Sequence, residues 1–112
     1  MERAELRVLF AAYEEAPLWE LTLEVRNYSP DGSAVFEPPI PREEVGAALV
    51  TALSRGDVTL YDRDDCDKRD IELEEALRIV NDDRFWSAAE APAAACLFLT
   101  EVGLKRLDQP PG

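Results

Sequence analysis

The stretch from Pro41 to Gly56 constrains the fold most, because it carries the signals of a helix with defined ends. Pro41 or Arg42 is expected to open the helix, acidic residues favour its first turn, and Gly56 ends it. Gly46 in the interior costs about 1 kcal/mol in helix propensity relative to alanine, which suggests a close contact with another helix there. The residues expected to face the core share a helical spacing: Val45, Ala48, Leu49, Ala52 and Leu53.

Two short strands are predicted around a long excursion. Residues 58–61 form a strand that leaves this helix at once, and residues 95–99 form a second strand suited to pair with it. The excursion begins with a polar run at 62–70. A helix follows at about 72–80, with an inward face made of Leu73, Ala76, Leu77 and Val80.

Phe85 and Trp86 lie in a short turn after that helix. Because the two rings are adjacent, one is expected to cover the core while the other lies at the surface. Thr100 is predicted to cap a last helix over residues 101–107, and residues 108–112 form a flexible tail.

The N-terminal part begins with a predicted helix at residues 3–15, in which apolar residues recur at helical spacing: Leu6, Leu9, Phe10 and Tyr13. Residues 18–28 alternate apolar and polar side chains as a strand would, but a helix opened by Pro17 fits them as well. Turn signals follow, and residues 34–36 are predicted to form a short strand.

The acidic surplus is the strongest indication of function. With 112 residues, of which 46% are hydrophobic, the chain is expected to fold as one domain over residues 1–107. Twenty-four acidic and twelve basic residues leave a net charge of -12. Such a surface repels nucleic-acid phosphates and attracts basic proteins, although it also serves solubility alone.

The location follows from apolar runs and cysteines. The chain begins with charged residues and holds no apolar run of the length of a signal peptide or membrane span, so we expect a cytoplasmic protein. Cys96 lies in an apolar run and is predicted to be buried. Cys66 lies in the polar run, and the two are not expected to form a disulfide.

Catalytic and metal-binding patterns are missing from the sequence. No histidine is present, the two cysteines cannot form a four-thiolate zinc site, and the five glycines are scattered singly. The run from Asp62 to Asp70 fails as a calcium loop, because Asp67 stands where glycine belongs and Leu73 where a carboxylate belongs. We therefore predict a protein that is not an enzyme, with no metal and no cofactor.

The order of the elements resembles a winged-helix domain. The stretch from Ile40 to Val58 resembles the third helix of that family running into the wing, and the stretch from Leu99 to Leu104 resembles the second wing strand passing into a final helix. The resemblance implies an α+β fold with three N-terminal helices, a short hairpin with a helical insertion in the wing, and a short C-terminal helix. It also favours a helix at residues 18–28.

Two functional hypotheses follow. The first is a non-enzymatic acidic protein that binds a basic macromolecular partner, as immunity proteins, antitoxins or nucleic-acid mimics do. Its contact residues would be eight carboxylates and one apolar anchor: Asp62, Asp64, Asp65, Asp67, Asp70, Glu72, Glu74, Glu75 and Trp86. Under this hypothesis the field of the carboxylates speeds encounter with the partner.

The second hypothesis, a DNA-binding transcription regulator, follows from the resemblance, because the third helix of that family enters the major groove. The matching residues would be Arg42, Thr51, Ser54 and Arg55. The matching wing segment opposes this, since its ten acidic and five basic residues at 62–84 carry a net charge of -5. A homodimer through the first helix, or through a strip around Trp19, is compatible with both hypotheses.

Overall fold

The computed structural model describes residues 3–23, 25–28, 34–87 and 95–108 and has the predicted α+β composition. Two antiparallel sheets of two strands each are present in these ranges. No helix within them is both long and apolar enough to cross a membrane. The helices are α1 (Arg3–Tyr13), α2 (Arg42–Arg55), α3 (Leu73–Val80) and α4 (Glu101–Asp108), the 3-10 helices are η1 (Leu18–Thr22) and η2 (Asp83–Trp86), and the strands are β1 (Val25–Tyr28), β2 (Ala34–Glu37), β3 (Val58–Asp62) and β4 (Ala95–Leu99).

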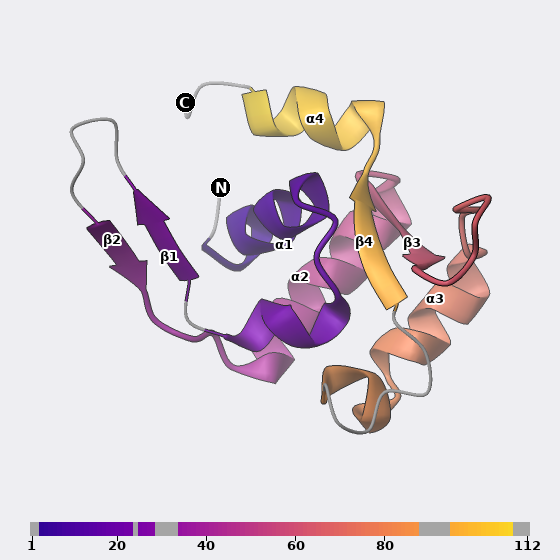
Figure 1. The fold of residues 1–112 in the computed structure, drawn as a ribbon, viewed down its shortest axis with the longest axis horizontal. Coiled ribbons are helices and arrows are strands. Elements are labelled where there is room, and N and C mark those ends of the chain that lie inside the picture. Colours follow the sequence, from indigo (N-terminus) through magenta and orange to yellow (C-terminus); the bar gives the residue numbers. More distant parts are fainter. Residues whose placement is uncertain (1–2, 24, 29–33, 88–94, 109–112) are drawn as a thin grey trace.

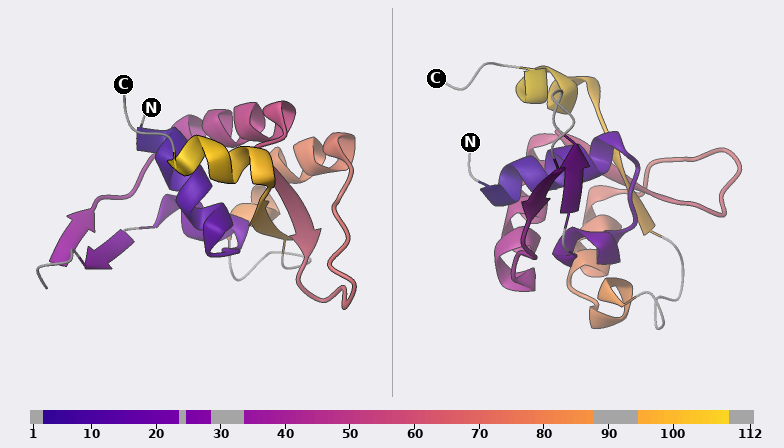
Figure 2. Two further views of the ribbon diagram at one scale, coloured as in Figure 1. Left: turned by 90° about the horizontal axis from the view of Figure 1, so that it is seen from above. Right: turned by 60° about the vertical axis from the view of Figure 1, so that its left-hand side comes forward.

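The core lies between α1, α2, η1 and the β3–β4 hairpin, with α3 against α2 and α4 across one end of α1 (Figure 1). The β1–β2 hairpin stands out from this body, and the loop between β3 and α3 projects on another side (Figure 2). Fully buried leucines fill the centre: Leu18, Leu21, Leu49, Leu60 and Leu97.

Helix α1 begins at the predicted residue but ends at Tyr13, two residues before its predicted end, and the predicted apolar face is wrong for three of its four residues. Leu9 is buried, whereas Leu6, Phe10 and Tyr13 are exposed. The core side of α1 instead carries small or branched residues and one arginine: Ala4, Arg7, Val8 and Ala12. Because alanine lets helices approach closely, the smaller face packs against α2 and the larger face is left outside.

Residues 18–28 are neither one strand nor one helix, so both alternatives are corrected. Pro17 precedes the five-residue 3-10 helix η1, in which Leu18 and Leu21 are buried at the i, i+3 spacing that such a helix brings onto one side. The chain is extended at Leu23, and β1 then pairs with β2 in antiparallel register, Val25 opposite Glu37. The predicted short strand at residues 34–36 is thereby confirmed.

Helix α2 confirms its predicted ends, and Gly56 adopts a left-handed conformation with φ of 80°. Four of the five residues predicted to face the core are buried, and the fifth, Ala48, is half-buried. The expected close helix contact at Gly46 is wrong. A methyl group added there would have Trp86 Cζ2 at 3.9 Å as its nearest neighbour, an ordinary contact distance.

We therefore expect Gly46→Ala to raise the free energy of unfolding by about 1 kcal/mol, the propensity difference between the two residues in a helix interior. Urea unfolding followed by circular dichroism measures the change. Val50→Ala, in the same helix, is the control: it removes apolar contact and should therefore lower the free energy of unfolding. A loss of stability in Gly46→Ala would contradict the space seen beside Trp86.

The predicted pairing of the two strands is confirmed. β3 and β4 are antiparallel, with Val58 opposite Leu99 and Tyr61 opposite Cys96. The chain after α1 joins the same sheet edge, since Pro17 bridges to Cys96 and the backbone N–H of Leu97 donates to the carbonyl of Ala16 at 2.9 Å. Cys96 is buried, Cys66 is exposed, and both are free thiols, as predicted.

Helix α3 begins one residue later than predicted and turns a different face inward. Leu73, predicted to be buried, is exposed, whereas Ile79 is buried beside Ala76 and Val80. Leu77 is half-buried against the core. Helix α3 packs against α2, and its first turn follows a loop that is held to β3 by the bond from the backbone N–H of Ile71 to the carbonyl of Leu60.

Thr100 caps α4 as predicted. Its Oγ1 accepts from the backbone N–H of Gly103 at 3.1 Å and donates to the carbonyl of Gly56 at 2.6 Å. The helix ends at Asp108, one residue beyond its predicted end and within the predicted tail. The other tail residues, 109–112, lie outside the described ranges.

Candidate functional site

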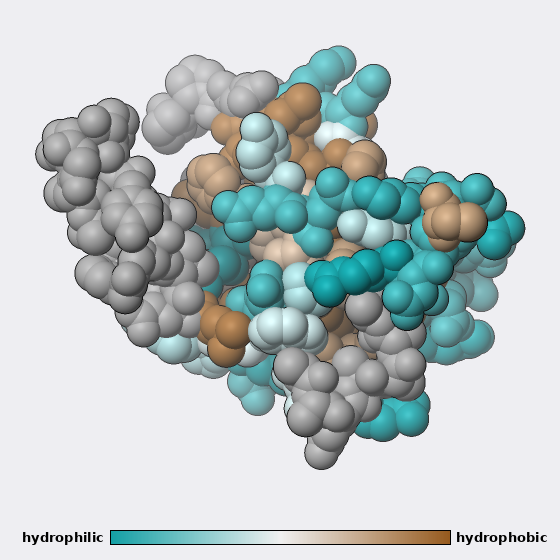
Figure 3. Space-filling model, viewed as in Figure 1, coloured by the Kyte–Doolittle hydropathy of each residue, from teal (hydrophilic) through white to brown (hydrophobic). Residues whose placement is uncertain are grey.

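The eight predicted acidic contact residues lie at the end of β3, on the loop between β3 and α3, and on the first turn of α3. We call them the acidic surface. Six are exposed, and Asp62 and Asp65 are half-buried. In Figure 3 hydrophilic residues cover the right-hand edge of the molecule, where Figure 1 places this loop and α3.

The loop is anchored at its base. Tyr61 bridges to Asp70, the backbone N–H of Ile71 donates to the carbonyl of Leu60 at 2.8 Å, and Thr59 Oγ1 donates to Asp70 Oδ1 at 3.1 Å. These contacts extend the β3–β4 hairpin by part of a third chain segment. The loop residues between them are therefore held in a defined position against the sheet.

Asp65 shapes the loop from within. Its Oδ1 accepts from the backbone N–H of Asp67 at 3.1 Å, and its Oδ2 accepts from Arg69 Nε at 3.2 Å. These bonds stabilise the ionised carboxylate, and the backbone bond of Asp67, followed by the Arg69 contacts, holds the pKa of Asp65 below its usual value. Asp62 also stabilises the loop, because its Oδ1 accepts from the backbone N–H of Asp64 at 2.9 Å.

The basic residues of the loop are partly engaged. Lys68 Nζ lies 3.6 Å from Glu15 Oε1 and 5.6 Å from the centre of the Tyr61 ring, and Arg69 pairs with Asp65. Tyr61 in turn donates to Glu15 at 2.9 Å, and burial, aided by this bond, raises the pKa of Tyr61 to about 12. Lys68 is thus drawn toward α1, away from the outer carboxylates.

The ion pairs leave most of the acidic surface uncompensated. Arg69 pairs with Asp65, and Arg78 pairs with Glu75 at 3.2 Å. The other six carboxylates form no ion pair with the residues that the structure describes: Asp62, Asp64, Asp67, Asp70, Glu72 and Glu74. The surface therefore offers negative charge to an external cation.

Asp65, Cys66 and Asp67 place three potential metal-ligand atoms within 4.8 Å of one another. The carboxylate of Asp65 is already hydrogen-bonded to the loop, and Cys66 and Asp67 are exposed. Exposed acidic groups approach one another in this way on any strongly acidic loop. The arrangement therefore carries no assignment of a metal site.

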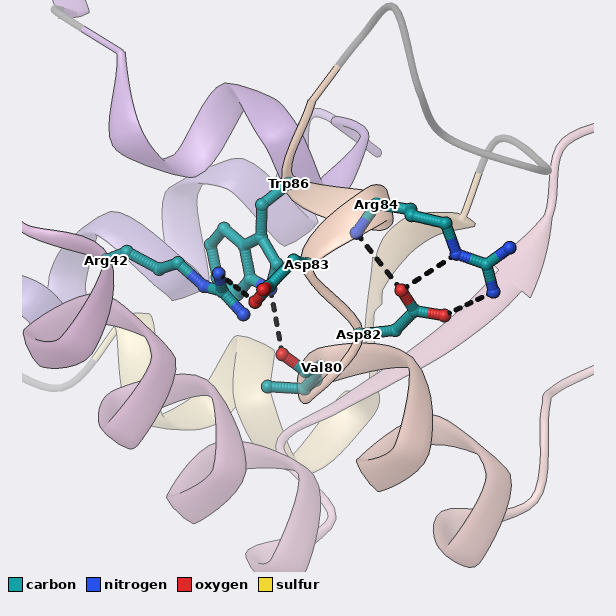
Figure 4. Close-up of polar contacts among 6 residues, drawn as sticks. All are labelled: Arg42, Val80, Asp82, Asp83, Arg84 and Trp86. Carbon is teal, nitrogen blue, oxygen red and sulfur yellow. Dashed lines mark hydrogen bonds and ion pairs between the residues drawn. The ribbon is translucent and has the colours of Figure 1, made fainter.

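Trp86 lies apart from the acidic surface, beyond the far end of α3 (Figure 4). Its indole Nε1 donates to the carbonyl of Val80 at 2.8 Å, and the Arg42 guanidinium lies 5.2 Å from the ring centre. Both Trp86 and its neighbour Phe85 are half-buried against the core, rather than one inside and one outside. The predicted anchor is therefore held within the domain by its own contacts.

Leu73 is the apolar residue that the structure does place on the acidic surface. It is 46% exposed and is flanked in sequence by Glu72 and Glu74. Sequence periodicity assigned it to the core, so it was missed as a contact residue. Its position gives the charged surface an apolar point that a partner could cover.

The four residues of the DNA-binding hypothesis are spread along α2. Arg42 Nη1 lies 2.5 Å from Asp83 Oδ1, and Thr51 Oγ1 donates to the carbonyl of Ala47. Ser54 and Arg55 are exposed at the C-terminal end, about 20 Å from Arg42 at the helical rise of 1.5 Å per residue. The two arginines therefore do not combine into one basic patch.

A second ion pair joins Arg84 of η2 to Asp82, the residue that precedes this helix. Arg84 Nη2 lies 2.7 Å from Asp82 Oδ2, and its Nε donates to Oδ1 at 3.1 Å (Figure 4). This arginine, through its side-chain bonds, holds the pKa of Asp82 below its usual value. The region is thus internally neutralised, in contrast to the acidic surface.

Comparison of the chain with models of protein families, with curated proteins and with solved structures found no match.

Proposed function

We propose that this chain is a non-enzymatic acidic protein that binds a basic macromolecular partner through the acidic surface, in the manner of immunity proteins, antitoxins or nucleic-acid mimics. The observation that carries the proposal is the set of six carboxylates without an ion pair among the described residues. Eight acidic and three basic residues between positions 62 and 75 leave a net charge of -5 on one projecting element.

The loop geometry supports recognition rather than solubility alone. Asp65 and the bonds to β3 hold the loop in position, so less conformational entropy is lost when a partner binds. Leu73 adds an apolar contact among carboxylates, which allows both electrostatic attraction and exclusion of water. A basic partner is attracted by the carboxylates and can cover Leu73, whereas a polyanion is repelled by the carboxylates.

The winged-helix resemblance belongs to this proposal as its fold component. The order α1, η1, α2, β3, β4 and α4 supports it, as do the end of α2 at Gly56 and the Thr100 cap. The bridge from Pro17 to Cys96 adds a third extended segment beside β4. The β1–β2 hairpin before α2 and helix α3 between β3 and β4 are additions to the pattern.

The test is to neutralise four unpaired carboxylates in the variant Asp64→Asn/Asp67→Asn/Glu72→Gln/Glu74→Gln and compare capture of basic proteins from extracts of the source cells. Exposed ion pairs contribute about 0.2–1 kcal/mol each, so losing four at roughly 0.4 kcal/mol each weakens binding on the order of ten-fold. A titration of each captured protein with purified wild type and variant, at several salt concentrations, measures the loss.

The matched control removes the same charge elsewhere, at four other exposed glutamates changed to glutamine: Glu14, Glu20, Glu43 and Glu44. We expect it to retain the partners at nearly wild-type affinity. Equal weakening by both variants would reduce the effect to net charge and contradict a specific surface. Binding to duplex DNA at low salt with no basic partner would instead favour the regulator hypothesis.

A further inference from the structure

Helix α1 exposes a strip of large apolar side chains on the side away from the core. Leu6, Phe10 and Tyr13 follow at spacings of four and three residues, and they are 36%, 54% and 65% exposed. The opposite side buries Ala4 and Ala12. The helix thus leaves its aromatic residues in water, an arrangement that costs free energy unless another surface covers them.

The strip continues onto β4 and α4. Tyr13, Phe98 and Leu104 line one open groove of about 200 Å³. Phe98 is 43% exposed and Leu104 is 41% exposed. In Figure 3 apolar residues gather at the top of the molecule, over α4 and the adjacent α1. We call this surface, made of Leu6, Phe10, Tyr13, Phe98 and Leu104, the α1–α4 face.

The size of the face indicates an interface. Its three aromatic side chains leave on the order of 300 Å² exposed, from the roughly 150–250 Å² that such a side chain presents. With the two leucines, the face falls within the roughly 300–600 Å² of the largest apolar patches on monomers, which are often binding sites. A polar rim around it would complete the roughly 800 Å² per partner of a standard interface.

The charge around the face indicates which partner covers it. Of the charged side chains of α1 and α4, Arg7 is buried and Arg106 pairs with the buried Asp57, so neither adds charge to the face. Arg3 and Lys105 balance Glu5 and Glu101, and Glu15, which lines the groove, pairs with Lys68, whereas the whole chain has a net charge of -12. Two copies that approach through any acidic side repel each other, but this side is nearly neutral. A basic protein gains no electrostatic advantage here, since its attraction is to the acidic surface.

We propose that two copies of the chain associate through the α1–α4 face as a two-fold symmetric dimer. In such a dimer the same patch contacts itself, and the aromatic strip of one copy covers that of the other. The groove borders the acidic loop at Glu15, which pairs with Lys68, but none of the eight carboxylates of the acidic surface lines it. The dimer therefore does not use the carboxylates of the proposed binding function and presents two acidic surfaces at once.

Sedimentation equilibrium of the full chain at concentrations between about 1 and 200 µM tests the proposal. A dimer with an interface at the small end of the standard range is expected to have its dissociation constant within these concentrations. We expect a reversible approach to twice the chain mass. Phe10→Glu should raise the dimer dissociation constant at least about ten-fold, because it places a charge at the centre of an apolar contact. Leu104→Glu, on the other helix, should act in the same direction.

The matched control is Leu73→Glu, which adds the same charge at an equally exposed leucine on α3. It should leave the dissociation constant of the dimer unchanged. A monomeric mass at every concentration overturns the proposal, and so does a dimer that all three variants leave intact. Because Phe10 is exposed and glutamate suits helices, its variant should keep the wild-type circular dichroism spectrum.

Discussion

Gly103→Ala should lower the free energy of unfolding by about 3 kcal/mol, at the upper end of the cost of inserting a methyl group into a packed site. A Cβ at this position would lie 2.0 Å from the carbonyl oxygen of Asp57 and 2.7 Å from Leu99 Cδ1. The first neighbour is backbone, so no side-chain rotation relieves the clash. The same carbonyl accepts from the backbone N–H of Thr100 at 3.1 Å, and it lies 2.9 Å from Thr100 Oγ1, whose one proton it shares with the carbonyl of Gly56.

The change therefore has to separate α4 from the chain that leaves α2. Alanine improves helix propensity by about 1 kcal/mol relative to glycine, and this gain does not offset the loss of the packed contact. Urea unfolding measures the difference, with Gly46→Ala as the matched control. The same substitution should then have opposite signs at the two helical glycines, and a stabilised Gly103→Ala would show that α4 is not packed as described.

The accuracy of sequence reasoning along this chain depends on whether the signal is local. The ends of α2 follow from Pro41, two glutamates and Gly56, each of which acts on its own backbone, and the structure confirms them. The β3–β4 pairing follows from two short apolar runs, and Thr100 identifies the start of α4. These features do not depend on what packs against them.

The buried faces of α1 and α3 depend on the elements that pack against them, and the faces predicted from the sequence were partly wrong. Leu6, Phe10 and Tyr13 have the spacing of a core face, but the close approach of α1 to α2 favours the alanine side. Leu73 has the right spacing as well, yet the loop that enters α3 holds its first turn outside. Periodicity identifies an apolar side of a helix and cannot identify its partner.

The prediction for residues 18–28 was wrong for a different reason. A 3-10 helix of five residues is too short to produce a pattern, and the following strand made the whole stretch resemble one alternating element. Pro17 was the usable signal, because an element has to start after it. The separation into two elements follows from burial of Leu18 and Leu21 in a core that the local sequence does not describe.

Exposure of the acidic residues was predictable, since unpaired carboxylates are rarely buried. Their individual parts were not. Asp65 forms bonds within the loop, and Trp86 lies beyond the far end of α3. Contacts of this kind join residues through three-dimensional placement, so composition alone could define the charge of the surface but not its geometry.

Arg106→Leu should lower the free energy of unfolding by about 3 kcal/mol, the lower end of the cost of leaving a buried carboxylate without its partner. Asp57 is 2% exposed, and its Oδ2 lies 2.9 Å from Arg106 Nε, while its Oδ1 has no hydrogen-bond partner among the described residues. The arginine side chain is 38% exposed, so water enters after the substitution and moderates the penalty. Urea unfolding measures this loss.

The double variant Asp57→Asn/Arg106→Leu separates the charge from the packing. With the carboxylate replaced by a neutral amide, losing the arginine should cost only about 1 kcal/mol, mainly through contacts of its aliphatic stem. The double variant is therefore expected to be more stable than Arg106→Leu alone. If the two variants unfold at the same urea concentration, the buried charge is not what Arg106 compensates, and α4 is instead held by Gly103 and the Thr100 cap.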